Sequence, residues 1–216
     1  MTVRVLLVDD HPIVVDGLVA ALARDERIAV VGSAGSVAEA RHLIELEDPD
    51  VVLLDLRLPD GSGVEILHEA RERGRPSMLV LSSFSGRQYV SAAIAMGASG
   101  YMLKTAPSSE IIGAIVAVAD GGVAFTAAQL RASRTAAWEP LTPVEHAVIE
   151  GVMRGRSNDE LRSNLGLSRK AIEGHLARLF ARYGAATRTE LAVHAEREGV
   201  LELPVGARKR RGVRAL

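Results

Sequence analysis

Short apolar runs alternate with helix-like segments over about the first 120 residues, and this alternation restricts the fold more than any other feature of the sequence. The apolar runs are Val3–Val8, Ile28–Gly32, Val51–Leu54, Met78–Ser82 and Tyr101–Leu103. The helix-like segments between and after them are Ile13–Ala23, Val37–Leu46, Val64–Glu72, Gln88–Met96 and Ser109–Ala119. The runs are continuously apolar, which is typical of strands buried on both faces. The pattern therefore predicts a five-stranded parallel sheet covered by helices on both sides.

The strand pattern lapses after Gly121-Gly122, and helix signals replace it. Thr142 and Glu145 have the spacing of a capping box, and Ser157 and Glu160 repeat that spacing. Further helices are expected over Arg169–Tyr183 and over Thr189–Glu198, which Gly199 ends. Four short helices without strands predict a small all-α domain. The expected division is 1–121 for the α/β domain, 122–140 for a linker that is helical in part, 141–203 for the helical domain, and 204–216 for a disordered basic tail.

Charge is distributed unevenly along the chain. Residues 1–138 contain 12 Lys and Arg against 17 Asp and Glu, whereas residues 139–216 contain 14 against 10. The front half therefore suits cations and the back half suits polyanions, although two solvated surfaces would explain the same difference. The chain has no cysteine, which excludes disulfides and thiolate metal sites, and it has no apolar run long enough to span a membrane. We expect a cytoplasmic protein without a membrane partner.

Charged and hydroxyl side chains follow four of the five predicted strands. They are Asp9, Asp10, Asp55, Ser82, Ser83 and Lys104. Ligand sites in open parallel sheets collect at the carboxyl ends of strands, so these groups are expected at one rim. Three carboxylates repel one another unless a cation lies among them, and Mg²⁺ prefers such oxygen ligands. A carboxylate there can also accept a phosphoryl group, which an ammonium and a hydroxyl would stabilise. Helix capping would explain any one of these residues alone, but not the joint arrangement.

The segment Ser157–Tyr183 reads as helix, short turn and helix. Ile172, Leu176, Leu179 and Phe180 form an apolar stripe on the second helix. The other face carries Arg169, Lys170, Glu173, Ala177, Arg178 and Arg182. A mostly basic face fits insertion into the major groove of DNA, and it fits an ordinary solvated helix equally well.

The first domain resembles the receiver domain of response regulators. The motifs are Val8-Asp9-Asp10-His11-Pro12, Leu53–Gly63, Leu81-Ser82 and Gly97–Lys104, in the family's order. The resemblance implies a flavodoxin-like fold, with Asp55 as the acceptor of a phosphoryl group from a sensor histidine kinase. It also implies that Asp9, Asp10, Asp55 and the backbone carbonyl of Arg57 hold Mg²⁺. Lys104 and Ser82 would hold the phosphoryl group, and Ser82 with Tyr101 would form a switch.

The second domain resembles the LuxR-type helix-turn-helix. The motifs are Leu141-Thr142-Pro143, Gly155–Leu161, Leu165-Gly166-Leu167-Ser168, His175-Leu176 and Thr187–Glu190. A receiver joined to this domain is the NarL/FixJ class, which implies a two-component response regulator, not an enzyme, that regulates transcription. The resemblance implies double-stranded DNA as a partner, homodimers when phosphorylated, and contacts from Ser168, Arg169, Lys170, Glu173, His175, Arg178 and Arg182.

Glu173 departs from the family pattern, in which a lysine that meets DNA is usual. One alternative is therefore a response regulator that acts through protein interaction or binds independently of phosphorylation. A second alternative, an aspartyl-phosphate phosphatase, requires Asp-x-Asp after its first strand, whereas Asp9 and Asp10 are adjacent. The six histidines lack ligand spacing, and for His11 the entry into a helix is the preferred explanation.

Overall fold

The computed structural model describes residues 2–135, 139–197, 199–202 and 205. The chain forms two compact units, Met1–Trp138 and Glu139–Leu216. The expected disordered tail of residues 204–216 lies, except for Val205, outside the described residues. Within the described part of the chain, no helix combines the length and the apolarity needed to cross a membrane.

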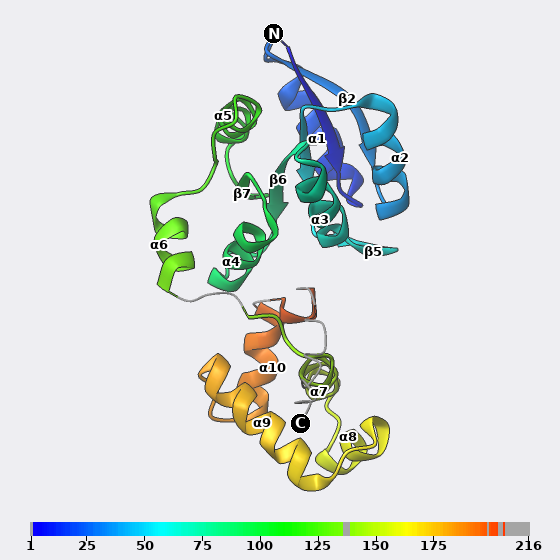
Figure 1. The fold of residues 1–216 in the computed structure, drawn as a ribbon, viewed down its shortest axis with the longest axis vertical. Helices are drawn as coiled ribbons and strands as arrows, with labels where there is room; N and C mark the ends of the chain where they lie inside the picture. Colours follow the sequence, from blue (N-terminus) through cyan, green and yellow to red (C-terminus); the bar gives the residue numbers. More distant parts are fainter. Residues whose placement is uncertain (1, 136–138, 198, 203–204, 206–216) are drawn as a thin grey trace, which may run out of the picture. The chain divides into compact units, whose positions relative to one another are not determined.

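The first unit contains a five-stranded parallel sheet in the order β2-β1-β3-β6-β7, which confirms the predicted fold class (Figure 1). The strands are β1 (Val3–Val8), β2 (Ile28–Ala34), β3 (Val51–Leu54), β6 (Ser77–Ser82) and β7 (Gly100–Leu103). Every residue of β3 is buried, as the continuous apolar runs predicted. The sheet therefore has helices on both of its faces, and the carboxyl ends of its strands point to a common rim.

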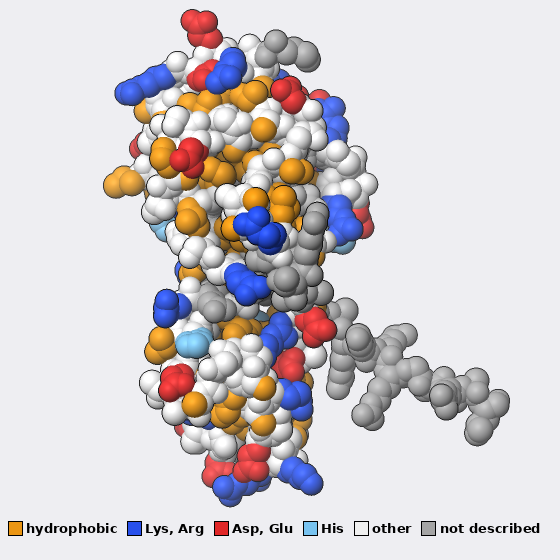
Figure 2. Space-filling model, turned by 90° about the vertical axis from the view of Figure 1, so that its left-hand side faces the viewer, with side chains coloured by type: hydrophobic (Ala, Val, Ile, Leu, Met, Phe, Trp, Pro, Cys, Tyr) orange, Lys and Arg blue, Asp and Glu red, His pale blue; other side chains and the backbone are white. Residues whose placement is uncertain are grey.

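Five helices cover this sheet. They are α1 (Pro12–Leu22), α2 (Val37–Glu47), α3 (Gly63–Arg73), α4 (Arg87–Met96) and α5 (Ser108–Ala119). The α1 helix contacts α5, while α3 contacts both α2 and α4, so the helices form two groups. The face that carries α5 and α6 shows broad apolar areas in the first unit (Figure 2).

A short hairpin, β4 (Arg57–Leu58) and β5 (Gly61–Ser62), lies between β3 and α3. The sequence pattern did not predict this hairpin, because strands of two residues leave no periodicity to detect. Asp60 in the hairpin loop accepts hydrogen bonds from the backbone N–H of Val37 and of Ala38, at 2.8 and 3.1 Å. Asp60 thereby caps α2 from a distant part of the chain and fixes the hairpin beside the sheet rim.

The expected linker contains a helix, α6 (Ala127–Thr135), that packs on α4 (Figure 1). Ala124 before it forms a parallel bridge with Gly100, and the N–H of Tyr101 donates to the Ala124 carbonyl at 3.0 Å. The first part of the linker is therefore attached to the last strand of the sheet. Residues 136–138 of the linker lie outside the described residues.

The second unit is the predicted bundle of short helices. Its elements are α7 (Pro143–Met153), α8 (Asn158–Leu165), α9 (Arg169–Tyr183), α10 (Arg188–Arg197) and the 3₁₀ helix η1 (Val200–Glu202). Both predicted capping boxes are present, at the starts of α7 and α8. The core includes Ile172, Leu176 and Leu179, all buried, which confirms the apolar stripe on the second helix of the pair.

Candidate functional site

Three strand ends bring opposite charges together at the rim of the sheet. Asp9 follows β1, Asp55 follows β3 and Lys104 follows β7. Lys104 Nζ lies 2.7 Å from Asp9 Oδ2 and 2.5 Å from Asp55 Oδ2. The side chain of Lys104 is only 10% exposed, and those of Asp9 and Asp55 are 4% and 6% exposed. The ammonium and both carboxylates are thus held almost out of water.

The acid group extends outward from this ion pair. One ligand atom each of Asp9, Asp10, His11 and Asp55 lies within 4.8 Å of all the others. Asp9 Oδ2 is buried, and the ammonium of Lys104 lies 2.7 Å from it. Carboxylates that leave water need cations to compensate them, and here one ammonium faces a group that contains three carboxylates. The set of hard oxygen ligands therefore fits a divalent cation such as Mg²⁺.

The electrostatics of Asp55 and Lys104 reflect this burial. Burial raises the pKa of Asp55 above its ordinary value, and the hydrogen bond from Lys104 opposes that rise without cancelling it. Burial alone would lower the pKa of Lys104, but its contacts with Asp55 and Asp9 outweigh burial and raise it. Lys104 therefore stays protonated, because two carboxylates face its ammonium.

A hollow of about 360 Å³ opens beside Asp55. It is lined by Asp10, His11, Asp55, Arg57, Leu58, Pro59, Ser83, Phe84 and Lys104. The backbone N–H of Arg57 donates to Asp55 Oδ1 at 3.2 Å, which orients the carboxylate. The Arg57 guanidinium lies 6.0 Å from the centre of the Phe84 ring. The hollow therefore gives a small anionic group access to one buried carboxylate.

Gly63 allows α3 to begin directly against the backbone of the loop that carries Asp55. A Cβ at this position would lie 2.3 Å from the backbone oxygen of Asp55 and 3.1 Å from the Cα of Leu56. No side chain fits there, since both obstacles are backbone. The first residue of α3 thus packs directly against the loop that carries Asp55.

The predicted switch residues are placed one layer deeper than the hollow. The hydroxyl of Ser82 accepts a hydrogen bond from the N–H of Phe84 at 3.1 Å, and Ser82 is buried. Tyr101 is 1% exposed and donates its hydroxyl proton to the Phe84 carbonyl at 2.7 Å. Ser83, the second strand-end hydroxyl, lines the hollow. Ser82 and Tyr101 meet through the backbone of Phe84.

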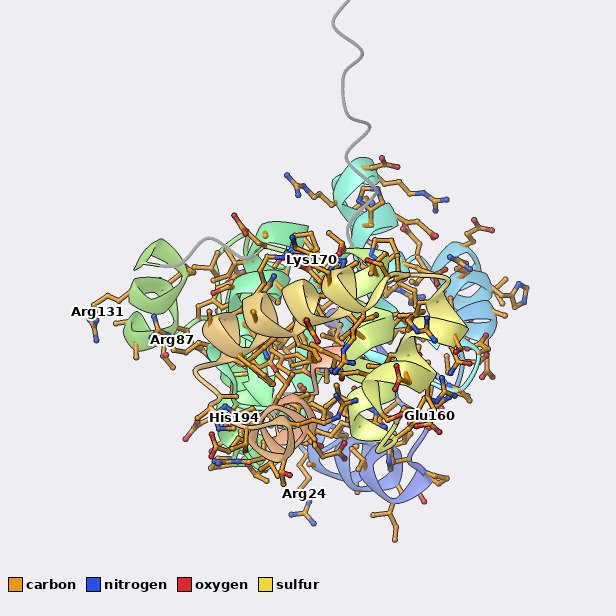
Figure 3. The ribbon with its side chains drawn as sticks, turned by 90° about the horizontal axis from the view of Figure 1, so that it is seen from below. Arg24, Arg87, Arg131, Glu160, Lys170 and His194 are labelled. Atoms are coloured by element: carbon orange, nitrogen blue, oxygen red, sulfur yellow. The ribbon has the colours of Figure 1, made fainter. Side chains whose placement is uncertain are left out.

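The predicted DNA-contacting residues of α9 fall into two groups. Ser168 is the N-cap, and its hydroxyl accepts a hydrogen bond from the Ala171 N–H at 3.2 Å. Arg169 Nε donates to Glu173 Oε1 at 3.0 Å, with the two side chains 73% and 53% exposed. Lys170 is exposed on the same helix (Figure 3). Glu173 is therefore not an isolated negative charge, because Arg169 accompanies it one turn away.

The second group, His175, Arg178 and Arg182, contacts other residues of the second unit. Arg178 contacts His175 Nδ1 at 2.7 Å and lies 3.6 Å from Glu145 Oε1 on α7. Burial and the neighbouring guanidinium of Arg178 lower the pKa of His175. Arg182 donates to the backbone carbonyl of Glu139. Arg178 and Arg182 are nevertheless exposed, so each can offer its remaining N–H groups to another molecule.

Several contacts at the rim were not expected from the sequence. His11 was predicted only to begin a helix, whereas its ring contacts both Asp9 and Asp10. Phe84 in the hollow and Gly63 beneath it had no predicted role. The adjacency of His11 to the acid pair was the one signal in the sequence that pointed to the first of these contacts.

Two family models match the chain. The one described as the response regulator receiver domain matches residues 5–116, and the one described as bacterial regulatory proteins, luxR family, matches residues 139–195. The chain is 34% identical to the transcriptional regulatory protein MctR of Rhizobium johnstonii, over 92% of this chain and 95% of MctR. It is 36% identical to the DNA-binding transcriptional activator DevR/DosR of Mycobacterium tuberculosis, over 89% and 94%.

Solved structures show the same fold. RcsB from Salmonella enterica serovar Typhimurium, bound to promoter P1flhDC in the presence of the phosphomimetic BeF3-, matches with a TM-score of 0.67. The identity is 24%, and the match covers 90% of this chain and 98% of RcsB. A structure of two RcsB dimers bound to two parallel DNAs matches with a TM-score of 0.65 and 22% identity, over 91% of this chain and 99% of that one.

Proposed function

This chain belongs to the two-component response regulators that join a receiver domain to a LuxR-type DNA-binding domain, and on that basis we propose that Asp55 is its phosphoacceptor. One observation carries the proposal. Asp55 is a buried carboxylate that borders an open hollow and faces Lys104 at 2.5 Å. In the transfer, a carboxylate oxygen of Asp55 forms a bond to phosphorus, and the bond from phosphorus to the histidine of a sensor kinase breaks.

Asp9, Asp10, Asp55 and the backbone carbonyl of Arg57 would hold Mg²⁺, which supplies charge neutralisation for the phosphoryl oxygens when bound. The three carboxylates that lie within 4.8 Å of one another, with a single ammonium beside them, support this assignment. Lys104 is placed to hold a phosphoryl oxygen, since its ammonium already lies against Asp55. The Arg57 N–H keeps the Asp55 carboxylate oriented.

Ser82 and Tyr101 are proposed to report the modification. For Ser82 to donate to a phosphoryl group, its hydroxyl must leave the Phe84 N–H, and the Phe84 backbone also holds Tyr101. A change at Ser82 therefore reaches Tyr101 through one backbone segment. The backbone N–H of Tyr101 in turn donates a hydrogen bond to the carbonyl of Ala124 at the start of the linker. This contact provides a physical route out of the receiver.

For the output, we propose binding of α9 in the major groove of double-stranded DNA by a phosphorylated homodimer in the cytoplasm. The exposed Lys170 and Arg169 and the N-cap Ser168 lie at the end of α9 that enters the groove in helix-turn-helix proteins. His175, Arg178 and Arg182 complete the set, with both arginines exposed. Nothing in the described residues favours the alternatives of a protein-interaction output or of phosphorylation-independent binding, and the relative DevR/DosR is a DNA-binding transcriptional activator.

Labelling of the full chain tests the phosphoacceptor. The protein is incubated with acetyl phosphate and Mg²⁺, and the intact mass and the modified peptide are measured. We expect one acid-labile phosphoryl group on Asp55, its loss in Asp55→Asn, and its loss when Mg²⁺ is chelated. Asp16→Asn, an exposed carboxylate of α1, serves as the matched control and is expected to label normally. Undiminished labelling of Asp55→Asn would refute the assignment.

A further inference from the structure

His11 stands at the N-cap of α1 without acting as a cap. N-cap positions favour side chains whose oxygen accepts a backbone N–H of the first turn. His11 makes no such side-chain bond, and Pro12 follows it at the first helical position. The first turn is served by the backbone carbonyl of His11, which accepts from Val14 and Val15 at 3.0 and 3.2 Å. The start of the helix thus requires the backbone at position 11, and gives no reason for an imidazole.

The ring of His11 is instead directed at the carboxylates of the rim. Its Nδ1 lies 3.0 Å from Asp9 Oδ1 and 2.8 Å from Asp10 Oδ1. Neighbouring ligand atoms around an octahedral divalent cation are separated by about 3 Å, because each lies about 2.1 Å from the ion. The nitrogen and the two oxygens are at hydrogen-bond distance and also have the separations of adjacent ligands, so a bound ion would take the place of any hydrogen that Nδ1 donates. Asp55 adds a fourth ligand atom within the 4.8 Å span of the group.

A second observation points to a cation in this place. The side chain of Asp9 is 4% exposed, and the ammonium of Lys104 lies 2.7 Å from its Oδ2. Lys104 contributes one positive charge to the buried pair of Asp9 and Asp55, whereas Asp10 adds a third carboxylate beside them. The His11 ring is 60% exposed and lines the hollow, so a dissolved ion can reach it directly.

We propose that His11 Nδ1 is a metal ligand, so that the rim of this receiver binds first-row transition ions such as Co²⁺ or Mn²⁺ more tightly than Mg²⁺. Imidazole is a good ligand for transition ions, whereas Mg²⁺ strongly prefers oxygen. A nitrogen added to a carboxylate set therefore raises the affinity for the transition ion and does little for Mg²⁺. The inference rests on the proposed metal site at Asp55, and it would let the available metal influence how readily the regulator is phosphorylated.

Isothermal titration of the full chain, without any added histidine tag, tests the proposal with Co²⁺ and Mg²⁺ as probes. We expect the His11→Asn variant to bind Co²⁺ about ten-fold or more weakly than the native chain, because even outer-shell partners of metal ligands are worth that much. The Mg²⁺ affinity should fall by much less than the Co²⁺ affinity, because towards Mg²⁺ His11 acts only as a neighbour of the carboxylates of Asp9 and Asp10. His42→Asn, an exposed histidine of α2, is the matched control and should change neither affinity.

Pulsed electron paramagnetic resonance of the Mn²⁺-loaded protein gives an independent readout. A ¹⁴N coupling of imidazole type is expected in the native chain and in His42→Asn, and its absence is expected in His11→Asn. Unchanged Co²⁺ affinity in His11→Asn, or an equal fall for Co²⁺ and Mg²⁺ without any ¹⁴N coupling in the native chain, would overturn the proposal.

Acetyl phosphate labelling separates this inference from the proposed function. If His11 is not a ligand, Asp55 should still be labelled in Mg²⁺ and the native Mg²⁺ affinity should persist. If instead the native chain binds Mg²⁺ without Asp55 labelling, the phosphoacceptor assignment fails, and a ¹⁴N coupling would still support His11 as a ligand.

Discussion

The rim of the sheet and the exposed side of α9 both collect charged side chains, but they hold them in opposite ways. Lys104 is 10% exposed and contacts carboxylates that follow other strands, one of them 49 positions earlier in the chain. Arg169 is 73% exposed, and its partner Glu173 lies one turn along the same helix. Tertiary structure thus places the charges of the rim, whereas local helix geometry places those of α9. Substitutions at the rim should affect both folding and chemistry, whereas substitutions on the exposed side of α9 should affect mainly binding.

The largest expected effect is that of Gly63→Ala, which tests whether the rim is a rigid frame. The new Cβ would meet the Asp55 carbonyl at 2.3 Å, and backbone cannot move aside cheaply. We expect a loss of roughly 3 kcal/mol in the free energy of unfolding, at the upper end for overpacking. Urea denaturation measures the loss. Asp55 labelling should fall as well, because any relief of the clash shifts the acceptor.

Gly17→Ala is the matched control for that substitution, since a Cβ added at this position of α1 would have nothing within 4 Å. Alanine in a helix interior should stabilise this site by about 1 kcal/mol. Equal and small effects of the two substitutions would show that the rim adapts as easily as a helix surface, and the contrast between the regions would then be wrong.

Glu173→Lys tests the exposed side of α9, the second of the two regions compared. It removes the ion pair with Arg169 and places a second cation on the exposed side of α9. Stability should change little, because exposed pairs contribute at most about 1 kcal/mol. DNA affinity should rise, and the slope of log affinity against log salt should steepen by about one, since one more phosphate is neutralised.

Fluorescence anisotropy on genomic fragments over a range of salt concentrations measures both quantities. Glu196→Lys, a charge reversal on α10, is the matched control and should move the slope less. If neither affinity nor slope changes in a folded Glu173→Lys protein, α9 is not in the DNA interface.

The smallest effect concerns the capping box of α8. The Ser157 N–H and hydroxyl donate to Glu160 Oε2 at 2.6 and 2.7 Å, and these bonds lower the pKa of Glu160 below its ordinary 4.5. The native pKa lies below the unfolded one, so the ionised carboxylate stabilises the fold above pH 4.5, and this contribution is lost as pH falls further.

Glu160→Gln should therefore be less stable than the native chain at neutral pH and nearly equal to it in acid. Urea denaturation at both pH values, with Glu196→Gln as an exposed control, measures the difference. A gap between the two proteins that persists undiminished in acid would assign the contribution to packing instead of charge.

The sequence was most informative where the backbone determines position. Strand ends converge in any parallel sheet, so Asp9, Asp55 and Lys104 could be placed together from the strand pattern alone. The starts of two helices could also be predicted, because Thr142 with Glu145 and Ser157 with Glu160 have the spacing of capping boxes. Both capping boxes are present. In these cases residue type and spacing are sufficient.

The details that escaped prediction depend on side-chain directions and on short segments. The hairpin of β4 and β5 has two residues in each strand, too few for any periodicity. The attachment of Ala124 beside Gly100 requires the folded sheet edge to exist first. Likewise, nothing in the sequence distinguishes Arg178, whose side chain contacts His175 and Glu145, from Lys170 of the same helix.

The central claim is that modification of Asp55 controls the DNA binding of the second unit. Beryllofluoride with Mg²⁺ mimics the phosphoryl group, and its effect is measured as DNA affinity and as sedimentation of the full chain, on genomic fragments that the native protein selects. We predict that it promotes dimers and raises DNA affinity in the native chain, and does neither in Asp55→Asn. Native protein that stays monomeric with unchanged affinity, or an equal response in Asp55→Asn, would contradict the claim.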